Sequence, residues 1–187
     1  MFNHVFKPWK QTGDNILILG QHDASEQWNG MPGMNIWFEQ QINEIRKHTD
    51  RPIQVRPHPR NPISLDLKKY KNVSLTRPVM DSNTIDDTNF KDTLKDVWAV
   101  INHSSNPAIE AVINGIPVFV SKDSLCHDVG NHSLDNINNP KMPDRQQWAN
   151  KLAYTEWFED EIEKGLPWHR IKNLSLIHIS EPTRQFR

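Results

Sequence analysis

Residues 98–120 constrain the fold most strongly, because they hold a strand–helix–strand pattern in about twenty positions. An apolar run is followed by a polar turn that contains two adjacent serines. Pro107 suits the first turn of a helix and Gly115 suits its end, so we predict a helix over residues 108–114. Residues 117–120 are a second apolar run. This order predicts a βαβ unit, and hence a parallel sheet.

The same alternation continues on both sides of this unit. Residues 15–20 are a continuous apolar run closed by Gly20, which is typical of a buried parallel strand. Phe38, Ile42 and Ile45 form a helical stripe within a predicted helix, 35–48. Further strands are predicted at 53–56 and 73–76, and further helices at 90–97 (capped by Asp87 or Asn89), 144–154 and 155–165. We therefore predict the α/β class, with an open, mostly parallel sheet.

The last two predicted helices are amphipathic. Their apolar stripe consists of Trp148, Leu152, Phe158 and Ile162. Because such a stripe normally packs on a core, we expect these side chains to face inward and to serve packing rather than binding.

The charge balance excludes several classes of protein. Among the 187 residues, 22 Lys and Arg oppose 23 Asp and Glu, a formal net charge of −1, whereas a generally basic nucleic-acid binder needs a strong excess of positive charge. No apolar run approaches the roughly 20 residues of a membrane span, so none is predicted. A single cysteine, Cys126, cannot form an internal disulfide, and no secretory signal precedes the first strand. A cytoplasmic location is predicted.

Both ends of the chain differ in character from its middle. Residues 174–184 resemble the translation of a sequencing adapter, so we expect residues 174–187 to be an artefactual tail; the alternative is a genuine strand at 174–179. Residues 1–14 have the composition of a linker or of a truncated N-terminal region, or else of a frayed terminus. The predicted domain is 15–173.

Two predicted strand ends carry unusual chemistry. Arg56, His58 and Arg60 alternate with two prolines directly after the strand at 53–56. A stiff loop that presents an imidazole and two guanidiniums suits an anion, phosphate above all, because its donors need little ordering on binding. The alternative is a plain proline turn with solvated arginines.

The second strand end is the turn with Ser104 and Ser105. Hydroxyls and free backbone N–H groups at a helix start favour negative charge, although a simple N-cap is the alternative. Glu110, further along the same helix, could reach a ribose or sugar hydroxyl, or could be a solvated carboxylate. Cys126, His127 and His132, with Asp128, could suggest a metal, but their spacing matches no regular zinc pattern, so we predict no metal and no cofactor.

Together, His58-Pro59 after one strand and Ser104-Ser105 after a later one resemble the C-terminal, donor-binding domain of GT-B glycosyltransferases. The resemblance is to bacterial sialyltransferases and capsule polysaccharide transferases that use CMP-activated sugars; teichoic-acid glycerophosphotransferases are similar in the same two places. Residues 104–120 look like the Ser-Ser/Thr…Glu-Ala…Gly-x-Pro-Val signature of that group, and the resemblance covers about 15–171. It implies a Rossmann-like half of a GT-B fold, a nucleotide-sugar donor as substrate, and a further N-terminal domain.

The resemblance also implies roles for individual residues. His58 would be the catalytic residue and would hydrogen-bond the donor phosphate, which Ser104 and Ser105 would bind as well. Arg56 and Arg60 would add positive charge, Glu110 would contact the nucleotide sugar, and Gln21 would edge the cleft. The general base that activates the acceptor would belong to the other domain, as it usually does in these enzymes, and no Asp/Glu-Asp/Glu-Gly motif that could supply it is present here.

Two other functions remain open from the sequence. One is a non-catalytic, flavodoxin-like binding or interaction domain. The other is transfer of a sugar to modified phage DNA rather than to a glycan, which would need a basic groove from another domain.

Overall fold

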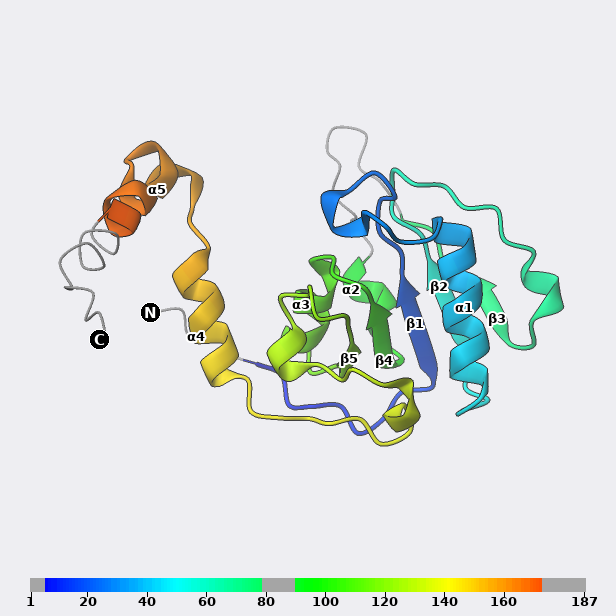
Figure 1. Ribbon diagram of the computed structural model, residues 1–187. Helices are drawn as coiled ribbons and strands as arrows, with labels where there is room; N and C mark the ends of the chain where they lie inside the picture. Colours follow the sequence, from blue (N-terminus) through cyan, green and yellow to red (C-terminus); the bar gives the residue numbers. More distant parts are fainter. Residues whose placement is uncertain (1–5, 79–89, 173–187) are drawn as a thin grey trace, which may run out of the picture. The chain divides into compact units, whose positions relative to one another are not determined.

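The computed structural model describes residues 6–78 and 90–172, and the chain in this part is built around one parallel sheet (Figure 1). Its strands are β1 (Asn15–Leu19), β2 (Ile53–Arg56), β3 (Val73–Leu75), β4 (Val97–Asn102) and β5 (Val118–Phe119). They lie in the order β3-β2-β1-β4-β5, and every pair is parallel. The predicted α/β class with an open parallel sheet is therefore confirmed. The order is that of the Rossmann fold and differs from the 2-1-3-4-5 order of a flavodoxin-like sheet, so the flavodoxin-like alternative is wrong in its strand order.

The helices connect these strands and follow them. They are α1 (Met34–Arg46), α2 (Phe90–Thr93), α3 (Pro107–Ile113), α4 (Gln146–Thr155) and α5 (Glu159–Glu163). Short 3₁₀ turns lie at η1 (Glu26–Trp28), η2 (Leu67–Lys69), η3 (His127–Val129) and η4 (Leu134–Asn136). The helix predicted over 90–97 ends at Thr93, because Val97 already pairs with Asn15 as the first residue of β4. Its predicted caps, Asp87 and Asn89, lie outside the described residues.

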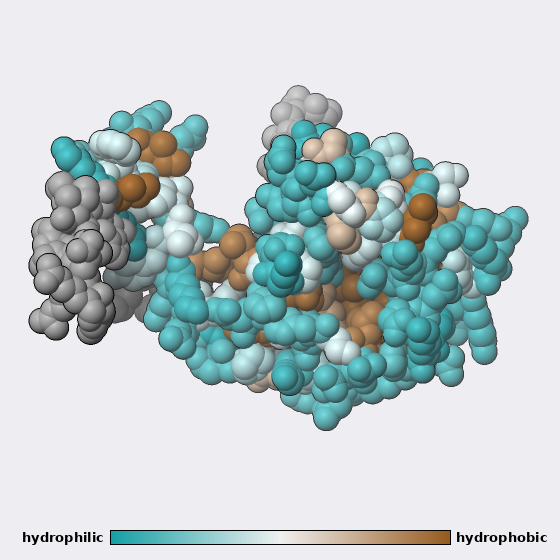
Figure 2. All heavy atoms as spheres, in the orientation of Figure 1, coloured by the Kyte–Doolittle hydropathy of each residue, from teal (hydrophilic) through white to brown (hydrophobic). Residues whose placement is uncertain are grey.

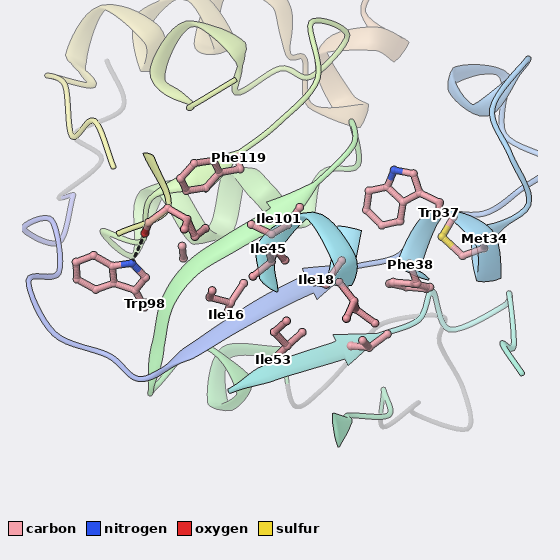
Figure 3. Packing of buried hydrophobic residues seen from close by; sticks show 14 of the residues in the cluster. Ile16, Ile18, Met34, Trp37, Phe38, Ile45, Ile53, Trp98, Ile101 and Phe119 are labelled. Atoms are coloured by element: carbon pink, nitrogen blue, oxygen red, sulfur yellow. Dashed lines mark hydrogen bonds between the residues drawn. The ribbon is translucent and has the colours of Figure 1, made fainter. Parts of the chain in front are cut away.

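The main core lies between the sheet and α1. Alternate side chains of the strands, among them Ile16, Ile18 and Ile101, meet the stripe of α1 that contains Phe38 and Ile45 (Figure 3). All five are at most 3% exposed. Full burial of one such side chain stabilises the fold by about 1.5–3 kcal/mol, so this layer holds α1 in place.

The opposite face of the sheet carries α3, which lies against β4 and β5. The chain runs from β1 outward to β3, then crosses to β4 on the other side of β1. Right-handed crossovers in these two opposite directions place α1 and α3 on opposite faces. The point where the direction changes lies between β1 and β4, and ligands of open α/β sheets bind at such a point, beyond the carboxyl ends of the strands.

The register brings the ends of the central strands to one level. Leu19 lies beside Arg56 of β2 on one side and beside Asn102 of β4 on the other. The loops that come after β1, β2 and β4 therefore begin next to one another.

The N-terminal segment packs on the end of α3. The backbone N–H of Lys7 donates to the carbonyl of Ile113, and that of Lys10 donates to the carbonyl of Gly115. Gly115 has a φ of +77°, and a Cβ there would collide with the carbonyl of Pro8. The described part of the predicted linker 1–14 is thus bonded to the domain, and residues 1–5 lie outside the described residues.

By their contacts, the described residues form two compact units that divide within α4, between Trp148 and Ala149. The predicted domain 15–173 crosses this division, and the predicted tail 174–187 lies outside the described residues. Trp148 is 4% exposed, as expected, but Phe158 and Ile162 of the second unit are more than half exposed, so the expectation that they face inward is wrong.

Hydrophilic side chains cover most of the visible face of the first unit, with hydrophobic ones mainly in recesses between them (Figure 2). In the described part of the chain, none of the helices combines the length and the apolar character needed to span a membrane.

Candidate functional site

A cleft of about 650 Å³ opens at the carboxyl ends of β1, β2 and β4. This is the place where the strand order reverses, and the volume is within the range of small-molecule sites. The cleft brings together all seven residues singled out from the sequence: Gln21, Arg56, His58, Arg60, Ser104, Ser105 and Glu110. The two strand-end clusters therefore face one cavity, as their positions after neighbouring parallel strands imply.

The His58 side chain is fixed by its own loop. Its ring Nδ1 accepts a hydrogen bond of 3.1 Å from the backbone N–H of Arg60. An Nδ1 that accepts must be unprotonated, so the ring proton is assigned to Nε2, which is a donor. Desolvation by burial, followed by the charges of His22 and Arg60, lowers the pKa of His58 below its ordinary value of 6.5. His58 is accordingly a neutral donor near pH 7.

The two arginines of this loop differ in their surroundings. Arg56 is 3% exposed, and its guanidinium lies over the ring of Phe90 at 5.8 Å. Arg60 is exposed at the rim. Burial removes screening by water, so the fixed charge of Arg56 acts more strongly on an anion in the cleft than a surface charge does.

The two serines have different partners. The Ser104 hydroxyl donates to Oε1 of Gln21 at 3.0 Å, and the Gln21 amide donates in turn to Oγ of Ser25 at 3.0 Å. The Ser105 hydroxyl oxygen accepts a hydrogen bond of 2.6 Å from Nδ2 of Asn102. Gln21, with 5% of its surface exposed, thus forms part of the buried wall between the β1 and β4 loops.

Neither serine is a side-chain cap of α3. The N-cap residue is Asn106, and its side chain makes no capping bond. The alternative interpretation, a simple serine N-cap, is therefore wrong. Because α3 has only seven residues, the candidate site consists of the side chains that line the cleft and not of the N-terminus of this helix.

Glu110 lies on the wall formed by α3. Its Oε1 accepts a 2.8 Å hydrogen bond from Nδ2 of Asn114, and Lys91 is 4.0 Å away. A carboxylate repels a phosphate but accepts hydrogen bonds from hydroxyls, so its position suits the sugar or ribose part of a ligand.

Several cleft residues were not predicted from the sequence. His22 lies edge-on to His58, with ring centroids 5.6 Å apart, and Ser25 and Gln27 complete the wall. Asn61, which does not line the cleft, connects its loops: it donates to the backbone carbonyl of Gln21 at 3.1 Å and also binds the carboxylate of Asp23. No motif marks these residues, because their loops meet only once β1 and β2 are paired.

The Cys126 thiol is poorly suited to bind a metal ion. Burial raises the pKa of this thiol to about 12, whereas a metal ligand must be a thiolate. Within residues 6–78 and 90–172, no group of three or more His, Cys, Asp or Glu side chains is placed to hold a metal ion.

Comparison of the chain with protein-family models, curated proteins and solved structures finds no match. The function is therefore inferred from the chemistry of the cleft and from the sequence motifs that line it.

Proposed function

We propose that this chain is the donor-binding domain of a glycosyltransferase, and that the cleft binds the phosphate of a nucleotide-activated sugar. The observation that carries the proposal is the meeting of the His58 imidazole, the Arg56 guanidinium and the Ser105 hydroxyl at the switch point of the sheet. Each group can donate to an anion, and all three are already held by a hydrogen bond or by burial. CMP-linked sugars are the first donors to test, because of the sequence resemblance.

The proposed chemistry is stabilisation of a leaving group. The bond between the anomeric carbon of the sugar and a phosphate oxygen breaks, and the nucleotide phosphate leaves with the electron pair. The Nε2–H of His58 donates to a phosphate oxygen as this charge develops, while Arg56 and Arg60 offset it. The carboxylate of Glu110 accepts a hydrogen bond from a hydroxyl of the sugar or ribose.

The oxygen of the acceptor hydroxyl attacks the anomeric carbon and forms the new glycosidic bond. Its proton passes to a base that we assign to another domain, as the resemblance implies. A glycan acceptor fits this chain better than DNA does. The formal net charge of the chain is −1, whereas non-specific binding to DNA requires an excess of positive charge.

Calorimetric titration of the full chain with CMP, CDP, UDP and cytidine tests the proposal. We expect the nucleotides to bind more tightly than cytidine, which lacks the phosphate. A hydrogen bond to a charged group contributes about 1.5–3 kcal/mol, so His58→Ala is expected to weaken binding of the preferred nucleotide at least about tenfold. His132→Ala, outside the cleft, is the matched control. Absence of nucleotide binding, or equal binding of cytidine, would overturn the proposal.

A further inference from the structure

Asn102 is a buried polar residue directly beneath the candidate phosphate site. It is the last residue of β4 and is 2% exposed. Because it lies beside Leu19 in the parallel register, the pleat directs both side chains to the same face of the sheet, and Leu19 lines the cleft. Asn102 does not line the cleft itself, so it acts there only through another residue.

That residue is Ser105. The Asn102 amide Nδ2 donates to Ser105 Oγ at 2.6 Å, while its Oδ1, although buried, has no hydrogen-bond partner among the described residues. The amide is therefore tied to the cleft on its donor side alone. An unpartnered buried oxygen lowers stability, and leucine, which has the same branching at Cγ but is larger, would avoid that cost. What leucine cannot supply is the N–H that faces Ser105.

The donor side determines what Ser105 can do. A hydroxyl has one proton and two acceptor lone pairs. Since the Asn102 N–H occupies a lone pair of Ser105, the Ser105 proton is directed elsewhere and remains available to the cleft. Ser104 has the opposite arrangement, because its proton already goes to Gln21 Oε1. The two neighbouring serines thus present a donor and an acceptor.

We infer that Asn102 is a positioning residue that commits the Ser105 hydroxyl to donate to a bound phosphate, and that Ser104 positions Gln21 instead. The inference rests on the proposed function, since it takes the ligand to be a phosphate. A phosphate oxygen only accepts, so a hydroxyl that turned its lone pairs toward it would repel it. The contribution of Ser105 to phosphate binding would then depend on one amide at the end of β4.

A double-mutant cycle on the full chain tests this coupling, with CMP and cytidine as probes. We expect Ser105→Ala to weaken CMP binding at least about tenfold and Asn102→Leu to weaken it several-fold, with cytidine unaffected. Asn102→Leu added to Ser105→Ala should cause no further loss, because Asn102 acts only through that hydroxyl. Additive losses would overturn the inference.

A second substitution reverses the hydrogen bond. Asn102→Asp would accept the Ser105 proton and add a negative charge, so CMP binding should fall more than with Asn102→Leu. Asn131→Asp is the matched control: Asn131 is also 2% exposed but bonds to the carbonyls of Val118 and Lys141, away from the cleft. Equal losses in the two Asp variants would overturn the inference.

A third comparison leaves the core untouched, in case the Asn102 variants do not fold. Ser105→Ala should weaken CMP binding more than Ser104→Ala, and equal losses would contradict the assigned roles. If the unaltered chain does not distinguish CMP from cytidine, the proposed function fails. If it does and the cycle is additive, only the role of Asn102 fails.

Discussion

The hydroxyl of Ser104 donates a 3.0 Å hydrogen bond to Oε1 of Gln21, joining two loops that are 83 residues apart in the chain. The loop after β1 and the loop after β4 both line the cleft. This bond and the hydrogen bond from Gln21 to Ser25 fix the side-chain amide of Gln21 between the two loops.

Replacing Gln21 should therefore destabilise the domain. Gln21→Leu removes both side-chain hydrogen bonds at a position that is 5% exposed, so we expect a loss of about 1–3 kcal/mol in the free energy of unfolding, measured with urea. Gln27→Leu is the control, since Gln27 lines the same cleft but is exposed; its effect should stay within about 0.5 kcal/mol. Similar losses in both variants would show that the buried amide network is not stabilising.

Gly20, at the end of β1, is expected to tolerate no side chain. A Cβ there would lie 2.8 Å from Cζ of Phe38 and 3.2 Å from the backbone nitrogen of His58. Because Phe38 is fully buried, Gly20→Ala should destabilise the fold by about 1–3 kcal/mol through overpacking. Gly33→Ala, where a Cβ meets nothing within 4 Å, is the control for thermal unfolding. Because Gly33 is the N-cap of α1, where Ala is less favourable, it should cost about 0.5–1 kcal/mol and less than Gly20→Ala. A neutral Gly20→Ala would contradict the packing described.

The stability of the chain should fall in mild acid partly because of His58. Its pKa in the folded protein lies below the ordinary 6.5, so on acidification the unfolded chain takes up the proton first. The contribution is present above pH 6.5 and declines as the pH falls below it. We therefore expect the stability difference between the unaltered chain and His58→Gln to shrink from pH 7 to pH 5 in urea unfolding. A difference that grows on acidification would refute this sign.

Arg145 should be needed to hold the N-terminal segment. Its guanidinium donates to the carbonyls of Val112 at 2.5 Å and Lys7 at 2.7 Å, and it lies 4.1 Å from the ring centroid of Trp9. Lysine keeps the charge but not the two-pronged geometry, so Arg145→Lys should cost about 1.5–3 kcal/mol in thermal unfolding. The same substitution at exposed Arg77 serves as control and should have little effect.

Cys126 should be unreactive in the folded protein. The thiol is fully buried, and desolvation raises its pKa to about 12. We expect no modification by a thiol-specific chromogenic reagent at pH 8 and one equivalent of modification in denaturant. Rapid labelling of the native chain would contradict this burial.

The sequence predicted the strands well because their patterns are local. The apolar run of β1 is continuous after Asn15, and β2 alternates Ile53 and Val55 with polar residues; the predicted bounds of both differ from those observed by at most one residue. The cleft could be located for a related reason: polar clusters that come directly after parallel strands must lie at the same edge of a sheet. His58 and Ser105 could therefore be assigned to this edge of the sheet without knowledge of the strand order.

The sequence could not predict which residues bond to which. The pairing of Gln21 with Ser104 and the position of Asn102 under Ser105 depend on β1 lying beside β4 in one register. Nor could periodicity decide the surroundings of Phe158 and Ile162. An apolar stripe identifies one face of a helix but not what covers it.

The pairing of β1 with β4 has a consequence for the order of folding. β1 can pair with β2 as soon as residue 56 is available, but the other side of the cleft needs residues 97–110. Closing the much longer loop costs more entropy, although the cost rises only with the logarithm of its length. A nascent chain that ends before β4 can therefore hold the His58 loop in place but cannot yet contain a binding site.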